Sequence, residues 1–273
     1  MKRRLVVNAD DFGFTRGVNA GIVEAHRKGI LTAATLMANG AAFDDAVRLA
    51  RENPSLDVGC HLVLVQGPSV ASGNPLPATL PSLLRAIALG RAKIYEELAA
   101  QIGRIEGTGI RPTHLDTHKH THLLPPVLDA VARLSEEHRI PWVRRPFDFP
   151  IEADGIPASK RMVSWGLGCL RPRFHRVLAR RGCRSADHFA GFRITGRYGA
   201  DELVRLIEQL PEGITEFMCH PGHCTDELRA APTRLKESRQ TELDALTAPE
   251  TRAALQDHGV QLTSYRELGG FNE

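Results

Sequence analysis

Short apolar runs alternate with amphipathic stretches along the chain, and this alternation predicts parallel β-strands joined by helices. The first apolar run covers residues 5–7, and Thr15, a residue type that caps helices, follows it. Val18, Ile22 and Ala25 then recur at helical spacing. Further strands are expected at residues 32–37, 58–65, 110–116, 141–144, 215–218 and 260–264. Strands in this arrangement favour an α/β fold, a closed or nearly closed (β/α) barrel in a single domain over residues 1–273.

The composition is that of an ordinary globular protein, with 42% hydrophobic and 25% charged residues. A formal net charge of +3 and an aromatic content of 5% argue against a nucleic-acid partner. The five cysteines form no Cys-x-x-Cys pair, which fits a reducing compartment. No apolar leader precedes the first strand, and no apolar stretch approaches the ~20 residues of a membrane span. We therefore expect a cytoplasmic protein without membrane insertion.

Two adjacent carboxylates, Asp10 and Asp11, stand where the first strand leaves the core. An isolated pair of this kind usually caps a helix or faces solvent. Side chains alternate along a strand, so only one of the two can face a given point unless the other turns in through the loop at Phe12 and Gly13. If both reach one site, one carboxylate can bind a divalent cation and the other can accept a proton from activated water.

A histidine-rich segment makes a metal site the favoured interpretation. Five polar residues share one parity, so they would line one face of an extended strand: His114, Asp116, His118, His120 and His122. A core face is not built from imidazoles, whereas imidazole and carboxylate are common metal ligands. One ion cannot bind all five, so the residues that do not bind the metal would contact the substrate or the side chains that bind the metal.

Three further residues stand at predicted strand ends. His61 ends an otherwise apolar strand, and His220 precedes a Pro-Gly turn after a late strand. His220 can act as a general acid for a leaving amine or can simply bond the backbone of the turn. Arg144 can orient a carboxylate such as Asp10 or contact substrate; Arg145 can do the same, and the sequence does not decide between the two.

Two stretches without periodicity follow predicted strand ends. Residues 67–81 are rich in Pro, Ser and Gly, and we expect them to form a loop over the site. Residues 145–160 form either a substrate-binding wall or an insertion packed on the rim of the barrel, and the sequence favours neither.

Four segments together resemble the YdjC-like carbohydrate deacetylase family, which includes chitooligosaccharide deacetylases and a branch associated with hopanoid biosynthesis. They are VNADDFG at 7–13, GCHLVL at 59–64, PTHLDTHKHTH at 112–122 and TEFMCHPG at 215–222. The resemblance implies a distorted (β/α) barrel of the glycoside hydrolase/deacetylase type. It also implies hydrolysis of an N-acetyl group from an amino sugar, either an oligosaccharide or a lipid-linked sugar, with the help of a divalent metal.

The resemblance also assigns roles. It implies that Asp11, His61 and His118 bind the metal, with magnesium expected first and zinc as the alternative. Asp10 would be the catalytic base and His220 the acid. Contacts to the substrate or to the ligands are expected from His120, His122, Asp116 and Arg144. Two other functions compete with this one: a metal-dependent phosphoesterase, and a carbohydrate-binding or regulatory protein without turnover. The expected partner is an N-acetylated sugar, and a homodimer is compatible with the sequence.

Overall fold

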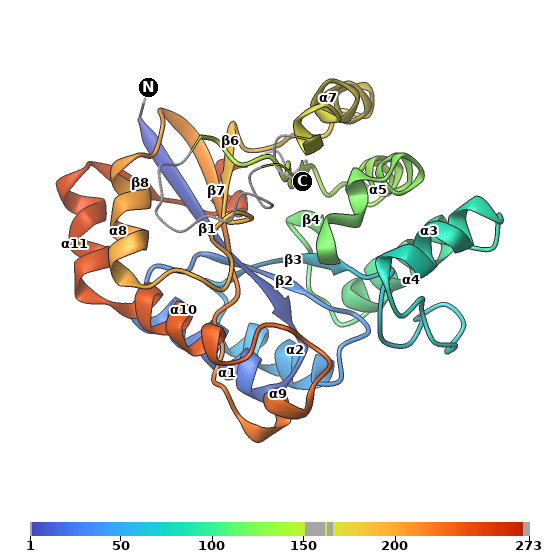
Figure 1. Cartoon of the computed structure of the whole chain (residues 1–273), viewed down its shortest axis with the longest axis horizontal. Coiled ribbons are helices and arrows are strands. Elements are labelled where there is room, and N and C mark those ends of the chain that lie inside the picture. The colour runs from blue at the N-terminus through green and yellow to red at the C-terminus, as the bar shows by residue number, and fades with distance from the viewer. Residues whose placement is uncertain (1, 151–161, 163–165, 270–273) are drawn as a thin grey trace.

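The computed structural model describes residues 2–150, 162 and 166–269, and its centre is a curled sheet of parallel strands (Figure 1). The sheet follows the order β5 (Trp142–Val143), β4 (His114–Thr117), β3 (Asp57–Leu62), β2 (Ala33–Leu36), β1 (Arg3–Phe12), β7 (Gly213–Cys219) and β6 (His188–Ala190). β8 (Val260–Leu262) pairs with the first residues of β1. Because β1 to β5 are added in chain order on one side, their carboxyl ends meet at one edge, where α/β proteins place their sites.

The two sides of the sheet approach each other beyond β5. Asp148 forms an isolated parallel bridge with Phe189 of β6, and the Phe149 N–H donates to the Phe189 carbonyl at 2.9 Å. This closure gives the distorted barrel expected from the sequence. Many polar and charged side chains are buried at the strands, beside a small apolar cluster of Val6, Ala33, Trp142 and Tyr265, whereas the main apolar core lies between the strands and the surrounding helices.

The helical segments of the described residues mostly cover the outside of the sheet (Figure 1). They are α1 (Arg16–Lys28), α2 (Phe43–Glu52), α3 (Leu80–Ala88), α4 (Ile94–Glu106), η1 (His118–Leu123), α5 (Pro125–Glu137), α7 (Arg171–Arg180), α8 (Ala200–Glu208), α9 (Asp226–Ala230), α10 (Glu237–Thr247), α11 (Pro249–Asp257) and α12 (Tyr265–Leu268). The predicted cap of α1 is confirmed, since the Thr15 hydroxyl accepts the Val18 N–H at 3.2 Å. Within the described residues, no helix combines the length and apolar character that crossing a bilayer requires.

The predicted extended face from His114 to His122 is wrong beyond Asp116. β4 ends at Thr117, and the chain then turns into the short 3-10 segment η1. Lys119 and His120 adopt φ values of 55° and 51°, in the left-handed region that ends an extended strand. The histidines of this segment therefore point in different directions. The strand expected at residues 58–65 likewise ends earlier, at Leu62, and β6 is a strand that apolar patterning did not predict.

Candidate active site

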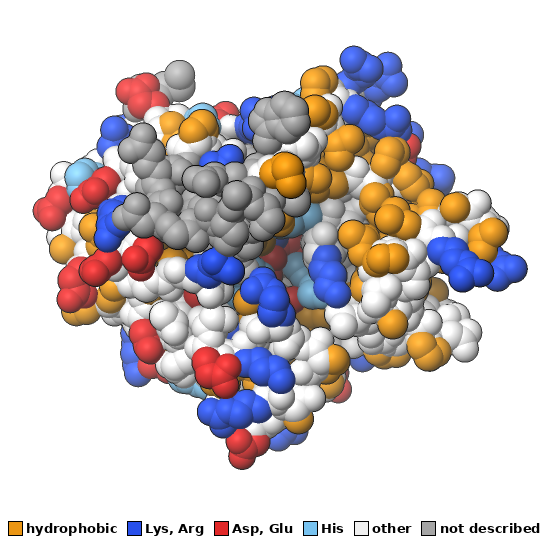
Figure 2. Space-filling model, in the orientation of Figure 1, with side chains coloured by type: hydrophobic (Ala, Val, Ile, Leu, Met, Phe, Trp, Pro, Cys, Tyr) orange, Lys and Arg blue, Asp and Glu red, His pale blue; other side chains and the backbone are white. Residues whose placement is uncertain are grey.

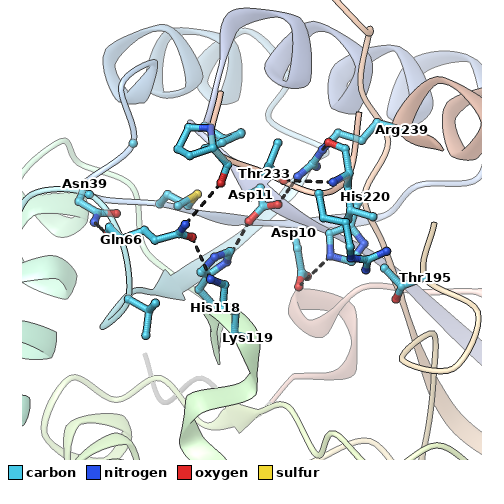
Figure 3. Close-up of a pocket in the computed structure, with 18 of the residues that line it drawn as sticks. Asp10, Asp11, Asn39, Gln66, His118, Lys119, Thr195, His220, Thr233 and Arg239 are labelled. Atoms are coloured by element: carbon cyan, nitrogen blue, oxygen red, sulfur yellow. Dashed lines mark hydrogen bonds and ion pairs between the residues drawn. The ribbon is translucent and has the colours of Figure 1, made fainter. Parts of the chain in front are cut away.

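A backbone irregularity lets both carboxylates at the end of β1 reach the same cavity. Asp11 adopts φ 66°, and the pairing of β1 with β2 shifts register between Ala9 and Phe12. Such a bulge rotates one side chain out of the alternation that a regular strand imposes. Asp10 and Asp11 consequently both line a cavity of about 620 Å³ at the carboxyl ends of the strands (Figure 3). Left-handed backbone in a residue other than glycine is uncommon, and it often marks a functional position.

Three ligand atoms converge beside Asp11. The Asp11 Oδ1 atom lies 3.4 Å from His61 Nε2 and 3.4 Å from His118 Nδ1, and the two nitrogens are 3.3 Å apart. Asp11 Oδ1 is buried and has no hydrogen-bond partner. Three atoms at these separations can share one cation at about 2.0–2.2 Å from each. The trio of Asp11, His61 and His118 therefore fits a divalent metal ion.

The carboxylate of Asp116 orients His61. The His61 Nδ1 atom lies 2.6 Å from Asp116 Oδ1, which directs Nε2 toward Asp11 and His118. A carboxylate behind a ligating imidazole fixes its ring orientation and its tautomer. Burial lowers the pKa of His61, but the nearby carboxylates of Asp116 and Asp11 outweigh burial and raise it to about 10. Negative charge gathered around this imidazole suits it to the binding of a cation.

Arg239 of α10 holds the other oxygen of Asp11. Its Nη2 atom lies 2.5 Å from Asp11 Oδ2, and both side chains are buried (Figure 3). Burial raises the pKa of Asp11, but Arg239, His118 and His61 together hold it well below its usual range. Asp11 is therefore ionised, and Oδ1 is free to bind a cation. Sequence reasoning missed Arg239, which lies more than two hundred residues away from Asp11.

Arg144 lies at the centre of a buried cluster of three carboxylates. Its Nη1 and Nη2 atoms donate to the two oxygens of Asp10 at 2.8 and 2.7 Å, and Nη1 also lies 2.7 Å from Asp116 Oδ2. Its Nε atom donates to Glu216 at 2.5 Å. The cluster shows that Arg144 faces the site, whereas Arg145 donates to the Asp187 carbonyl on the side of the barrel. Burial raises the pKa of Asp10, but Arg144 and His61 overcome burial and lower it well below its usual range.

A second group of possible ligands is already neutralised. The ligand atoms of Asp10, His61 and Asp116 also lie near one another. The guanidinium of Arg144 bonds both carboxylates of this group, and the His61 Nδ1 atom is taken by Asp116. A metal there would have to displace an arginine, so the group formed with Asp11 and His118 is the better cation site.

His220, directly after the end of β7, lies beside Asp10 in the cavity (Figure 3). Its Nε2 atom lies 3.8 Å from Asp10 Oδ2, and its Nδ1 atom is buried without a hydrogen-bond partner. The backbone N–H of His220 donates to Glu242 Oε2 at 2.6 Å, and this oxygen also accepts from the Tyr198 hydroxyl at 3.0 Å. Burial lowers the pKa of His220, although the charges of Asp10 and Glu242 oppose this effect. Sequence reasoning also missed Glu242.

The remaining histidines of the series serve different purposes. His114 is buried against Tyr265 and bonds Asn8, away from the cavity. His122 Nε2 lies 3.1 Å from the Arg144 carbonyl oxygen. Burial lowers the pKa of His122 to about 3, so this imidazole is neutral and helps to position the backbone of Arg144. His120 lines the cavity and packs near Phe192, with its Nδ1 atom lacking a partner. Only His120 among these three is placed to touch a substrate.

The opening of the cavity lies between the two halves of the barrel, and Figure 2 shows it as a hollow with acidic and histidine side chains at its base. One wall comes from Gln66 together with Gly67 and Pro68, the first two residues of the loop predicted to cover the site; residues 69–81 of that loop do not line the cavity. Lys119 donates to the Gln66 side chain at 2.9 Å across this wall. Of the wall predicted at residues 145–160, the part from 151 onward lies outside the described residues.

The opposite wall carries Phe192 and Thr195, and the buried Asp148 holds it in place. Asp148 accepts the backbone N–H groups of Phe192 and Arg193 at 3.2 and 2.9 Å. Burial raises its pKa from 3.8 to about 6 despite these bonds. Since the pKa is higher in the folded state than in the unfolded state, the contribution of Asp148 to stability falls as the pH rises from 4 to 6.

Replacing Asp148 with Asn should remove this pH dependence. The stability advantage of the wild type over Asp148→Asn should be about 2 kcal/mol larger at pH 4 than at pH 7. Urea unfolding of both proteins at the two pH values measures the difference. An advantage that is equal at both pH values, or larger at pH 7, would contradict the raised pKa.

The fold and the site together define a class: an α/β barrel protein with a buried carboxylate and histidine cluster at the carboxyl ends of its strands. The chain belongs to the YdjC-like protein family, whose model matches residues 4–257. It is 36% identical to a carbohydrate deacetylase of Brevibacillus brevis, over 97% of this chain and 100% of that protein. It is 35% identical to a carbohydrate deacetylase of Geobacillus stearothermophilus, over 98% and 99% of the two chains.

A solved structure from Enterococcus faecalis V583, a proposed cellobiose-phosphate cleavage protein, superposes with a TM-score of 0.77. The two chains are 23% identical, and the match covers 98% of this chain and 100% of the other. At this level of identity the likeness establishes the shared fold.

Proposed function

We propose that this chain is a metal-dependent carbohydrate deacetylase whose residues 1–273 form one catalytic domain. The observation that carries the proposal is the convergence of Asp11, His61 and His118 on one point beside Asp10 and His220. The relatives named carbohydrate deacetylase, which match over nearly their whole lengths, support the same reaction. A protein that only binds carbohydrate has no use for a buried base and acid beside a cation site.

The reaction is hydrolysis of an N-acetyl amide on an amino sugar. A divalent cation held by Asp11, His61 and His118 would supply Lewis-acid chemistry, polarising the acetyl carbonyl and lowering the pKa of water. Asp10 accepts the proton of the attacking water on a carboxylate oxygen, and Arg144 keeps that carboxylate ionised and fixed in direction. His220 delivers a proton from Nε2 to the sugar nitrogen as the bond between carbon and nitrogen breaks.

The lowered pKa of His220 leaves its imidazole neutral at pH 7 before the reaction begins. The proton that it gives to the amine therefore has to reach it during turnover. The Nε2 atom is 3.8 Å from Asp10 Oδ2, so a small approach would form a hydrogen bond between them. The proton taken up by Asp10 can then pass to His220 and on to the leaving amine.

The ligand set bears on the identity of the metal. Two imidazole nitrogens and one carboxylate oxygen are typical ligands of zinc and of neighbouring transition metals. Magnesium, which the family resemblance suggests first, prefers oxygen ligands and retains several waters. We propose a transition metal of the zinc type, with magnesium as the alternative that reconstitution must separate.

A phosphoesterase remains a competing function because the cavity wall carries positive charge. Lys119, Arg234 and Arg239 all line the cavity. Arg239 is neutralised by Asp11, which leaves only Lys119 and Arg234 of these three cations to meet a phosphate. The amide hydrolase is therefore the function that the site supports better.

The test is an assay of acetate release from N-acetylated chitooligosaccharides, run beside phosphate release from a phosphate monoester. We expect acetate release that falls below about one per cent after chelation and returns when zinc or magnesium is added back. Metal content per chain, measured on the same samples, shows which ion restores the rate. Phosphate release without acetate release would overturn the proposal, and so would acetate release that is indifferent to chelation.

His120 should contribute to substrate binding without contributing to the metal site. Removing its ring removes one hydrogen bond to a bound sugar, so His120→Ala should raise KM by about tenfold and leave the metal content unchanged. Steady-state kinetics of acetate release and elemental analysis measure the two quantities. His258→Ala, at a partly exposed histidine far from the cavity, is the matched control. Loss of metal from His120→Ala would contradict this role.

A further inference from the structure

The helix α3 presents leucine side chains to solvent. It begins at a capping box formed by Thr79 and Ser82, and its inner face packs Leu83 into the core. Leu80 and Leu84 lie one turn apart on the outer face and are 38% and 44% exposed. Leu89, just after the helix, is 52% exposed.

This outer face differs from that of an ordinary surface helix. Such a helix places an apolar stripe against the core and polar residues outward. Three of the four large hydrophobic side chains that are exposed in the described part of the chain lie within residues 80–89. Single exposed leucines are normal, but leucines gathered on one projecting helix indicate an interaction surface.

The exposed charges within residues 80–93 have one sign, and the next acidic residue is Glu96 in the first turn of α4 (Ile94–Glu106). Asp and Glu make up 32 of the 273 residues, yet neither occurs between residues 58 and 95. Arg85, Arg91 and Lys93 are exposed beside the leucines. Figure 2 shows hydrophobic side chains on the side of the molecule where α3 and α4 lie, with Lys and Arg at its outer edge. The surface therefore complements a partner that is both apolar and negatively charged.

We propose that this surface docks the protein onto an anionic lipid membrane. The docking surface consists of Leu80, Leu84, Arg85, Leu89, Arg91 and Lys93. Two contributions hold an interfacial helix on a bilayer. Leucines enter the boundary between headgroups and acyl chains, and flanking cations bind the anionic headgroups. No spanning segment is involved.

A second copy of this chain is a poorer occupant. A two-fold dimer brings the same patch of both subunits together. Arg85, Arg91 and Lys93 of one copy would then face the same three cations of the other, with no Asp or Glu between residues 58 and 95 to offset them. A lipid surface carries the complementary charge, and it has no defined shape that the patch must match.

The docking surface is joined to the wall of the cavity by a short ordered connection. The Gln66 N–H donates to the Pro77 carbonyl and the Leu76 N–H to the Gly67 carbonyl, both at 2.9 Å. These bonds close the base of the loop between β3 and α3. Docking through α3 would therefore hold the cavity wall at Gln66 and Gly67 near the membrane.

Sedimentation with vesicles tests the proposal. The whole protein is mixed with vesicles of phosphatidylcholine alone, or with vesicles in which about one third of the lipid is phosphatidylglycerol. We expect binding to the anionic vesicles that weakens with added salt, and little binding to the neutral ones. An absence of binding to the anionic vesicles at low salt would overturn the proposal.

Two variants separate the apolar and ionic contributions. Leu84→Ser with Leu89→Ser should weaken vesicle binding by about tenfold, and Arg85→Glu with Arg91→Glu and Lys93→Glu by about a hundredfold. The matched control reverses three exposed cations on other helices, Lys28→Glu, Arg48→Glu and Arg229→Glu, and should retain most of the binding.

Two measurements keep the docking proposal separate from the proposed function. Acetate release from a water-soluble sugar should be unchanged in the α3 variants, since none of the substituted residues lines the cavity. Light scattering reports the oligomeric state. Equal vesicle binding by the control and the cation-reversal variant would overturn the proposal, as would a wild-type dimer that Leu84→Ser with Leu89→Ser dissociates.

Discussion

The substitution Asp10→Asn should lower kcat for acetate release by about a thousandfold while the metal content stays the same. Asn has nearly the same shape as Asp, but it cannot accept the proton of the attacking water, and loss of a general base costs about 10²–10⁴ in rate. Asp10 contributes no atom to the group formed by Asp11, His61 and His118, so the cation site is preserved. The measurement pairs steady-state kinetics with elemental analysis of the purified variant.

Asp44→Asn is the matched control for this prediction, because Asp44 is exposed on α2 and does not line the cavity. It should retain wild-type kcat and metal content. Loss of metal from Asp10→Asn would show that Asp10 is a ligand, and the roles of the two adjacent carboxylates would then have to be exchanged. A variant that keeps its rate would remove Asp10 from the reaction altogether.

The strand and helix pattern was predictable because it rests on short-range physics. Buried parallel strands need continuous apolar runs, and the helices that cover them need apolar residues three and four apart. The strand ends followed from the same pattern, and they brought Asp10, His61 and His220 to one edge of the sheet. Short strands were harder to predict: β6 is only His188–Ala190, too short for periodicity to be visible.

The direction of individual side chains was less predictable. Parity placed five residues on one face, but left-handed backbone at Lys119 and His120 separates His120 and His122 from the residues that precede them. A similar departure at Asp11 has the opposite effect and brings two neighbouring carboxylates together. None of these three positions is glycine, the usual sequence signal of positive φ, so tertiary contacts decide the backbone conformation there.

The helical spacing of Arg239 and Glu242 is a sequence signal for buried ion pairs on α10. Together with Leu243 and Leu246 they occupy the buried side of α10. Charged residues rarely occupy a buried stripe unless they are paired. A stripe of positions 239, 242, 243 and 246 that mixes leucine with charge thus indicates buried ion pairs, although it does not identify Asp11 as the partner.

The substitution Arg144→Met should be the most destabilising change in the site, lowering the free energy of unfolding by about 3–5 kcal/mol at pH 7. Arg144 is fully buried, and it neutralises Asp10, Asp116 and Glu216 at once. Without it, three carboxylates remain buried together without their main counter-charge. Arg144→Lys keeps one positive charge but loses the bidentate contact with Asp10, so an intermediate loss is expected.

The pH dependence distinguishes this electrostatic cause from a simple packing defect. In Arg144→Met the carboxylates have higher pKa values when folded than when unfolded, so the loss of stability is full at high pH and is relieved as the pH falls. Urea unfolding at pH 5 and pH 7 should therefore show a smaller difference from wild type at pH 5. Arg145→Met, one position along the chain, should change stability by less than about 1 kcal/mol at either pH. A loss for Arg144→Met that is the same at both pH values would mean that cavity formation, and not unpaired negative charge, destabilises the variant.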